Sequence, residues 1–164
     1  MAFVVENGTG LSNSNSYISV ADADSYFTDR NKTDWISKSE AEKKAALIEA
    51  TRFIDGNYLW TGHIKYNDQS LGWPRILVCD DEGRNIDSDT IPERVKFATC
   101  ELAYEALTKS LSPALPRGGE IKRRKVSSLE VEYFSNSSPD KVFPIANQLL
   151  KGFYKNSPTV KLTR

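Results

Sequence analysis

The chain has 164 residues, which fit a single domain large enough to bury a core of its own. Its hydrophobic share of 39% and charged share of 27% are ordinary for a globular protein and argue against a disordered or fibrous chain. Because 22 basic residues balance 22 acidic ones, the molecule as a whole has no long-range field that would gather nucleic acid. Any DNA contact must therefore be local.

The first residues show neither a basic start nor an apolar run of signal-peptide length. No stretch approaches the roughly 20 apolar residues of a membrane span. We therefore expect a protein of a cytosol-like compartment that makes no membrane contact.

The N-terminal segment, residues 1–18, predicts an arm that becomes ordered on contact with a partner. Phe3, Val4 and Val5 form an apolar group at its start, and the Gly, Ser and Asn residues that follow cannot build a core by themselves.

Two helices are predicted after this arm. Ser19 can cap a first helix over about residues 20–30. Ser39 and Glu42 form a capping box for a second helix, which should end near Gly56.

A third helix should begin after Thr90, with Pro92 in its first turn, and continue toward Leu111. The apolar residues of the second and third helices recur at helical spacing. This pattern predicts a shared core that includes Leu47, Ile54, Val95, Leu102 and Ala106.

A long connection, residues 57–90, separates these two helices and should contain at most a small hairpin. Connections of this length are usually functional, and this one holds Trp60, Trp73 and Arg75. Aromatic residues beside arginine anchor subunit interfaces or stack on the bases of single strands. They also pack within their own chain, and the sequence leaves these alternatives open.

Residues from about 120 to 134 predict a β-hairpin, because apolar residues there alternate with glutamates. The hairpin region carries the one dense basic group of the sequence: Arg117, Lys122, Arg123, Arg124 and Lys125. These cations can contact phosphates or an acidic protein surface. Pairing with glutamates on the opposite strand would consume much of their charge.

A last short helix should begin near Phe143 and Pro144 and use Ile145, Leu149 and Phe153. The tail that follows, residues 155–164, has Val160 and Leu162 as its aliphatic residues and ends at Arg164. So few apolar side chains cannot offset the entropy lost when the tail becomes ordered, which predicts that a partner orders it.

These elements predict a mainly α fold of the α+β class. It should be a small bundle of three to four helices with one β-hairpin and extended N- and C-terminal arms. The expected divisions are residues 1–18, 19–154 and 155–164. Because an isolated hairpin is marginal in water, a neighbouring subunit is one natural support for it.

The residues suited to catalysis are few. His63 is the one histidine, and Cys79 and Cys100 stand in no metal-binding spacing. The sequence contains no phosphate-binding glycine loop and no nucleophile elbow. The acidic turn Asp80–Glu82 lacks the ligand spacing of a calcium loop. We therefore predict no enzymatic activity, no catalytic residues, no metal and no cofactor.

Several segments carry a resemblance to a known family: MAFVVENGTGLSNSNSYISVADADSYF, AALIEATRFID, QSLGWPR, DDEGRNIDSDTIPERVKFATCELA, RGGEIKRRKV and LEVEY. Their order, from residue 1 to about 150, resembles a phage protein family labelled DnaT-like single-stranded-DNA-binding protein, whose members sit with the head-assembly genes.

The resemblance implies a structural head-to-tail adaptor of a tailed bacteriophage. Such an adaptor is a ring, usually twelve-fold, that docks beneath the portal protein and receives the tail or the next neck protein. Double-stranded DNA passes through its channel without sequence recognition. The implied location is the neck of the virion, after assembly in the host cytoplasm.

Under this hypothesis, one set of residues joins neighbouring subunits: Phe3, Val4, Val5, Trp60, Trp73 and Arg75. The basic group of the hairpin region, together with Val160, Leu162 and Arg164, meets the portal or the DNA. The family label implies an alternative, a single-stranded-DNA-binding protein of phage replication that uses Arg123, Arg124, Trp73 and Tyr133.

Overall fold

The computed structural model describes residues 2–112, 123–126, 129–132 and 143–155. Residues 2–111 and 143–155 belong to one compact unit, here called the body, and residues 112–142 form a second unit. The fold is mainly helical with small antiparallel ribbons, which confirms the predicted class.

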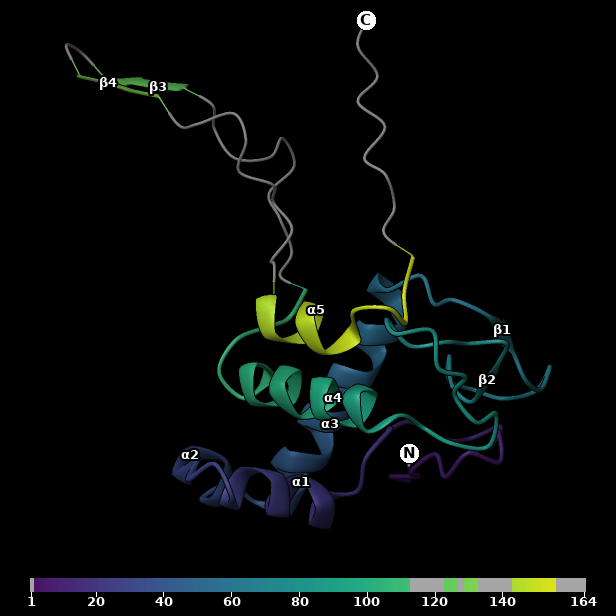
Figure 1. Cartoon of the computed structure of the whole chain (residues 1–164). Helices are drawn as coiled ribbons and strands as arrows, with labels where there is room; N and C mark the ends of the chain where they lie inside the picture. Colours follow the sequence, from purple (N-terminus) through teal and green to yellow (C-terminus); the bar gives the residue numbers. More distant parts are fainter. Residues whose placement is uncertain (1, 113–122, 127–128, 133–142, 156–164) are drawn as a thin grey trace, which may run out of the picture. The chain divides into compact units, whose positions relative to one another are not determined.

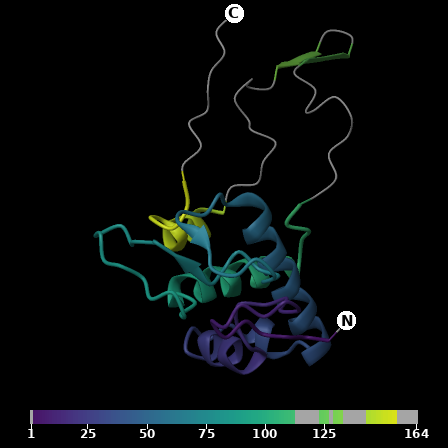
Figure 2. The same ribbon diagram turned by 90° about the vertical axis from the view of Figure 1, so that its right-hand side faces the viewer.

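Five helices make up the described body: α1 (Val20–Thr28), α2 (Thr33–Ile36), α3 (Glu40–Asn57), α4 (Glu93–Ala106) and α5 (Pro144–Leu150). Helix α4 is central, because α3, α5 and α1 all pack against it. Figures 1 and 2 show α5 and α1 on opposite sides of α4, with the long α3 crossing it. None of the helices in the described ranges is long and apolar enough to cross a membrane.

The predicted starts of the first two helices are confirmed. The Ser19 side chain accepts a hydrogen bond from the Asp22 amide at 3.1 Å. At α3, Ser39 and Glu42 make both bonds of the capping box. Both caps satisfy amides that the first turn of a helix leaves without intrahelical partners.

The predicted cap of α4 is wrong. Thr90 lies in the preceding turn, where its amide bonds to the Asp87 carbonyl at 3.2 Å. Pro92 occupies the N-cap position, and no side chain caps the helix. Its fixed φ and missing N–H suit a helix start, so the helix begins at Glu93 without a capping side chain.

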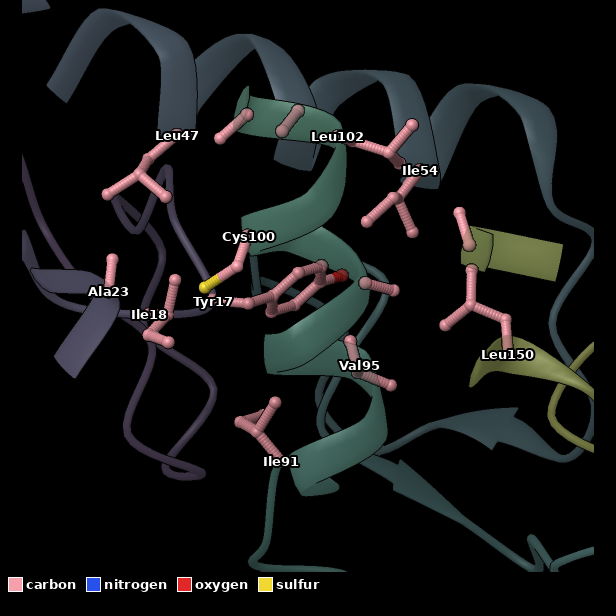
Figure 3. Packing of buried hydrophobic residues seen from close by; sticks show 14 of the residues in the cluster. Tyr17, Ile18, Ala23, Leu47, Ile54, Ile91, Val95, Cys100, Leu102 and Leu150 are labelled. Atoms are coloured by element: carbon pink, nitrogen blue, oxygen red, sulfur yellow. The ribbon is translucent and has the colours of Figure 1, made fainter. Parts of the chain in front are cut away.

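The shared core of α3 and α4 is largely as predicted. Leu47, Ile54, Val95 and Leu102 are buried, whereas Ala106, at the end of α4, is only half-buried. Figure 3 shows side chains from both helices gathered around α4, with Leu150 of α5 completing the cluster.

Helix α2 was not predicted. Its Trp35 is fully buried, and the ring packs against Phe27 with centroids 4.6 Å apart. The Trp35 indole N–H donates to the Asp24 carboxylate at 2.7 Å. A single turn with no side-chain cap shows little periodicity, so this contact of α1 with α2 has no clear signal in the sequence.

Helix α5 is rotated relative to its predicted face. Ile145 is 54% exposed, which makes its assignment to the core wrong. Ala146 and Leu150 are buried in its place, and Phe153 is buried as expected. Ala146 and Leu150 are four residues apart, as one face of a helix requires.

Two small ribbons complete the described elements. In the long connection, β1 (His63–Ile64) pairs antiparallel with β2 (Arg75–Ile76), which matches the small hairpin expected there. In the second unit, β3 (Arg123–Val126) pairs antiparallel with β4 (Leu129–Glu132), inside the predicted hairpin.

Candidate functional site

A half-buried carboxylate organises the long connection. Asp55, near the end of α3, accepts hydrogen bonds at Oδ1 from the Tyr17 hydroxyl at 2.6 Å and from the Trp60 indole at 3.0 Å. At Oδ2 it accepts the Gly72 amide at 2.9 Å. Burial raises the pKa of Asp55, while these three donors oppose the rise. We use the name Asp55 knot for five residues: Tyr17, Asp55, Trp60, Gly72 and Arg75.

Gly72 is required at its place in the knot. A Cβ there would lie 2.5 Å from the Trp60 indole nitrogen and 2.7 Å from Asp55 Oδ1. Only glycine lets the loop backbone approach the carboxylate closely enough to bond it.

Arg75 uses its guanidinium within the loop. Its nitrogens donate to the carbonyls of Thr61 at 2.7 Å, Gly72 at 2.9 Å and Gly62 at 3.1 Å. Desolvation lowers the pKa of this side chain, and the charges of Asp55 and Tyr17 counteract part of that effect. Because these nitrogens already donate to three carbonyls of the loop, Arg75 stabilises the loop. It does not offer an unused pair of donors to a neighbouring subunit or a phosphate.

The two predicted interface tryptophans pack inside the molecule. Trp60 and Trp73 meet edge to face with ring centroids 5.7 Å apart, and Trp73 contacts Phe153 in the same way. Trp73 is 0% exposed and Trp60 6%. Packing within the chain is therefore the alternative that the structure supports. Stacking of Trp73 on a DNA base is excluded, because a buried ring has no free face.

The N-terminal segment also packs on its own body. Phe3, Val4 and Val5 are half-buried, Phe3 packs against the core, and the Ser70 amide donates to the Leu11 carbonyl at 3.1 Å. This segment was predicted to become ordered only on contact with a partner, but it is ordered within the single chain. The side chains of Phe3, Val4 and Val5 remain partly exposed.

The residue that orders this segment is Glu6, which the sequence analysis missed. Its buried carboxylate accepts bonds from the amides of Gly8, Gly10 and Leu11 and from the Ser14 hydroxyl, all at 2.9–3.0 Å. The sequence offers one signal for such a carboxylate held by backbone amides: a glutamate followed by Gly, Ser and Asn residues.

The basic group is described in part. Arg123, Arg124 and Lys125 lie in β3. The remaining predicted contacts are outside the described residues: Arg117, Lys122, Tyr133, Val160, Leu162 and Arg164. In the ladder, Arg123 is opposite Glu132 and Lys125 opposite Glu130, but Arg124 is opposite Val131.

Charge is distributed unevenly along the chain. The body, residues 2–111 and 143–155, has 14 basic and 18 acidic residues. Residues 112–142 have six basic and four acidic residues, and residues 156–164 have two basic residues and no acidic ones. A polyanion is therefore repelled by the body and attracted to the segments outside it.

The residues considered for catalysis do not gather in the described chain. His63 and Cys79 are exposed, whereas Cys100 is buried, and burial raises the pKa of its thiol. The acidic turn is held by its own contacts, since Asp80 accepts from the Arg84 side chain at 2.8 Å. No group of His, Cys, Asp or Glu that could hold a metal is found in the ranges searched.

The sequence matches one family model along its whole length, residues 1–164; the family is described as "Putative DnaT-like ssDNA binding protein". The chain belongs to this family. No curated protein and no solved structure matches it. The family description agrees with the second hypothesis drawn from the sequence and mentions no ring, portal or tail.

The segments that carried the resemblance to this DnaT-like family meet in the Asp55 knot. Tyr17 belongs to the opening segment, Asp55 to AALIEATRFID, and Gly72, Trp73 and Arg75 to QSLGWPR. These motif residues therefore maintain the fold of the body.

Proposed function

We propose that this protein binds single-stranded DNA through the basic residues of β3, Arg123, Arg124 and Lys125. The observation that carries the proposal is membership of the DnaT-like family over the whole chain, whose description names this ligand. Two further observations support the choice of residues. The body has an excess of acidic residues, and its tryptophans are buried.

The ladder register suggests unequal roles for the three cations. Glutamates opposite Arg123 and Lys125 offset part of the charge that these residues offer, because opposite charges across a strand pair attract each other. Arg124 has Val131 opposite it and is expected to contribute most. With so few cations, we expect a dissociation constant no tighter than about 1 µM at physiological salt.

The experiment is a fluorescence-anisotropy titration of a labelled single-stranded oligonucleotide with the full-length protein. We expect the triple variant R123S/R124S/K125S to bind at least about tenfold more weakly, and R124S alone to account for most of this loss. A matched control removes three exposed cations of the body, in K32S/R52S/K109S. If the control weakens binding as much as the triple variant does, β3 is not the binding element.

A second candidate function is the structural head-to-tail adaptor of a tailed phage. In this proposal the chain forms a ring of about twelve copies in the virion neck, between the portal and the tail or neck protein, around double-stranded DNA. The supporting observation is a concentration of exposed apolar side chains on the long connection, among them Leu59, Ile64, Ile76 and Leu77. Exposed apolar surface of this kind marks sites of protein contact.

Co-sedimentation with purified portal rings separates the two functions. An adaptor should join the rings in the absence of DNA, and the R123S/R124S/K125S variant would test whether the hairpin takes part. A protein that stays in the supernatant at concentrations well above 10 µM would argue against the adaptor function.

A further inference from the structure

The register of the β3–β4 ribbon divides its residues between two faces. Residues directly opposite each other in an antiparallel pair share a face, and successive residues along a strand alternate between the faces. Two cross-strand pairs therefore lie on one face, here called the charged face: Arg123 with Glu132, and Lys125 with Glu130. The other two pairs lie on the opposite face, here called the aliphatic face: Arg124 with Val131, and Val126 with Leu129.

The charged face has a formal charge of zero. Its two glutamates balance Arg123 and Lys125, and each glutamate is directly opposite one of these cations. Opposite charges across a strand pair attract each other, whereas the same carboxylates repel a phosphate that approaches this face. The charged face is therefore the less favourable side for a nucleic acid.

The aliphatic face combines positive charge with apolar residues. It has one cation, Arg124, three aliphatic residues and no acidic residue. Within the second unit, the described residues include no element besides β3 and β4, so none of them covers this face. An anionic ligand with apolar parts matches both of its properties.

Charge alone would favour duplex DNA over a single strand. Phosphates are more densely spaced along the duplex, and each phosphate that a cation neutralises there releases more counterion. A preference for the single strand must therefore come from contact with groups that the duplex hides. Unpaired bases are such groups, because their apolar ring faces are stacked inside a duplex and accessible in a single strand.

We propose that the aliphatic face holds unpaired bases of single-stranded DNA, with Leu129 and Val131 against the base rings and Arg124 at a neighbouring phosphate. This face, more than the positive charge of β3, then selects the single strand over the duplex. The inference rests on the single-strand binding proposed above and deepens it, since it names the residues that recognise the bases.

Anisotropy titrations of the full-length protein test the assignment with a labelled single strand of about 20 nucleotides and with the duplex made from it. The variant L129T/V131T removes apolar groups from the aliphatic face, and threonine retains a high β-propensity. The matched control E130T/E132T places the same residue at two positions of the same strand on the charged face. The conservative variant L129I/V131I keeps the aliphatic face apolar. Circular dichroism should show the helices of the body unchanged in each.

We expect the natural chain and L129I/V131I to bind the single strand at least about threefold more tightly than the duplex. L129T/V131T should bind the single strand about fivefold more weakly and lose this preference, while its affinity for the duplex stays within about twofold. E130T/E132T should bind both forms more tightly and keep the preference, because it removes two negative charges from the ribbon.

Three results would overturn the inference. One is a natural chain that prefers the duplex. Another is an L129T/V131T protein that keeps the preference of the natural chain; if it also loses a self-association seen for the natural chain in sedimentation velocity, the aliphatic face binds a second copy. The third is an equal loss of single-strand affinity in E130T/E132T, which would make the integrity of the ribbon the cause.

Failure of this inference is distinguishable from failure of the proposed function. If R123S/R124S/K125S abolishes binding but L129T/V131T leaves the preference for the single strand intact, β3 binds DNA and the aliphatic face does not recognise bases. A natural chain that binds neither form of DNA would contradict both proposals.

Discussion

The Tyr17 hydroxyl donates a 2.6 Å hydrogen bond to Asp55 Oδ1 and accepts the Trp73 amide at 3.2 Å. It thereby joins the end of the N-terminal segment, helix α3 and the long connection, parts of the chain that are far apart in sequence. A buried hydroxyl that satisfies a carboxylate and an amide together fixes their relative positions.

Replacing Tyr17 with phenylalanine should destabilise the protein by about 1–3 kcal/mol, because the half-buried Asp55 carboxylate loses its shortest bond and the buried Trp73 amide loses its acceptor. Urea denaturation followed by circular dichroism measures this change. Tyr104→Phe is the matched control, since its hydroxyl also donates to an aspartate, Asp34, but in an exposed position at 3.1 Å. There we expect a loss of less than about 0.5 kcal/mol; equal effects would contradict a special role for the knot.

The raised pKa of Asp55 predicts a dependence of stability on pH. Its pKa in the folded protein lies above the ordinary value of 3.8, so in the window above that value the folded state holds a proton that the unfolded state has released. The free energy of unfolding attributable to Asp55 should therefore be greatest in acid, fall as the pH rises through this window, and level off above it.

Comparison with D55N isolates this effect, because the other carboxylates cancel in the difference between the two proteins. The stability of the natural chain minus that of D55N should decline as the pH rises from about 3.8 and become constant above the raised pKa of Asp55 in the folded protein. Denaturation curves at a series of pH values provide the test. A difference that grows with pH would mean that the pKa of Asp55 is lowered.

Two glycines with positive φ distinguish the stability cost of backbone strain from the cost of a steric clash at an added Cβ. Gly8 has φ +98°, and a Cβ there would lie 1.9 Å from the Asp89 carbonyl oxygen. Gly83 has φ +81° and no atom near such a Cβ. We expect Gly83→Ala to cost about 1 kcal/mol in thermal or urea denaturation, and Gly8→Ala clearly more. Similar losses would show that the N-terminal segment moves away from Asp89 easily.

Leu102→Ala should cost about 2–5 kcal/mol, the usual range for a buried leucine, because it leaves a cavity between α3 and α4. Leu59→Ala, at an exposed position, should change the free energy of unfolding by less than about 0.5 kcal/mol. Near-equal urea midpoints for the two variants would contradict the assignment of the core.

The sequence predicted the parts of the fold that local chemistry determines. The capping serines of α1 and α3 and the spacing of Leu47, Ile54, Val95 and Leu102 identified helices and core correctly. The hairpin followed from the alternation of apolar and acidic residues around β4.

The features that were missed depend on particular side-chain contacts, which residue type and spacing do not reveal. Trp60, Trp73 and Arg75 have a composition typical of interfaces. Their inward packing depends on Asp55 at the end of α3, five residues before Trp60, and on Phe153, which is distant in sequence. Glu6 likewise looked like part of a polar arm until its bonds to the following glycines placed it in a buried cradle. Side-chain type alone does not distinguish an anchor for a partner from an anchor within the chain.

The most direct test of the proposed DNA binding by β3 is the salt dependence of its affinity for a single-stranded oligonucleotide. About three phosphate contacts should give a plot of the logarithm of the association constant against that of the salt concentration with a slope near −2. R123S/R124S/K125S should bring this slope close to zero, and K32S/R52S/K109S should leave it unchanged. A slope that the β3 substitutions do not alter, or no detectable binding by the natural chain even at about 50 mM salt, would contradict the proposal.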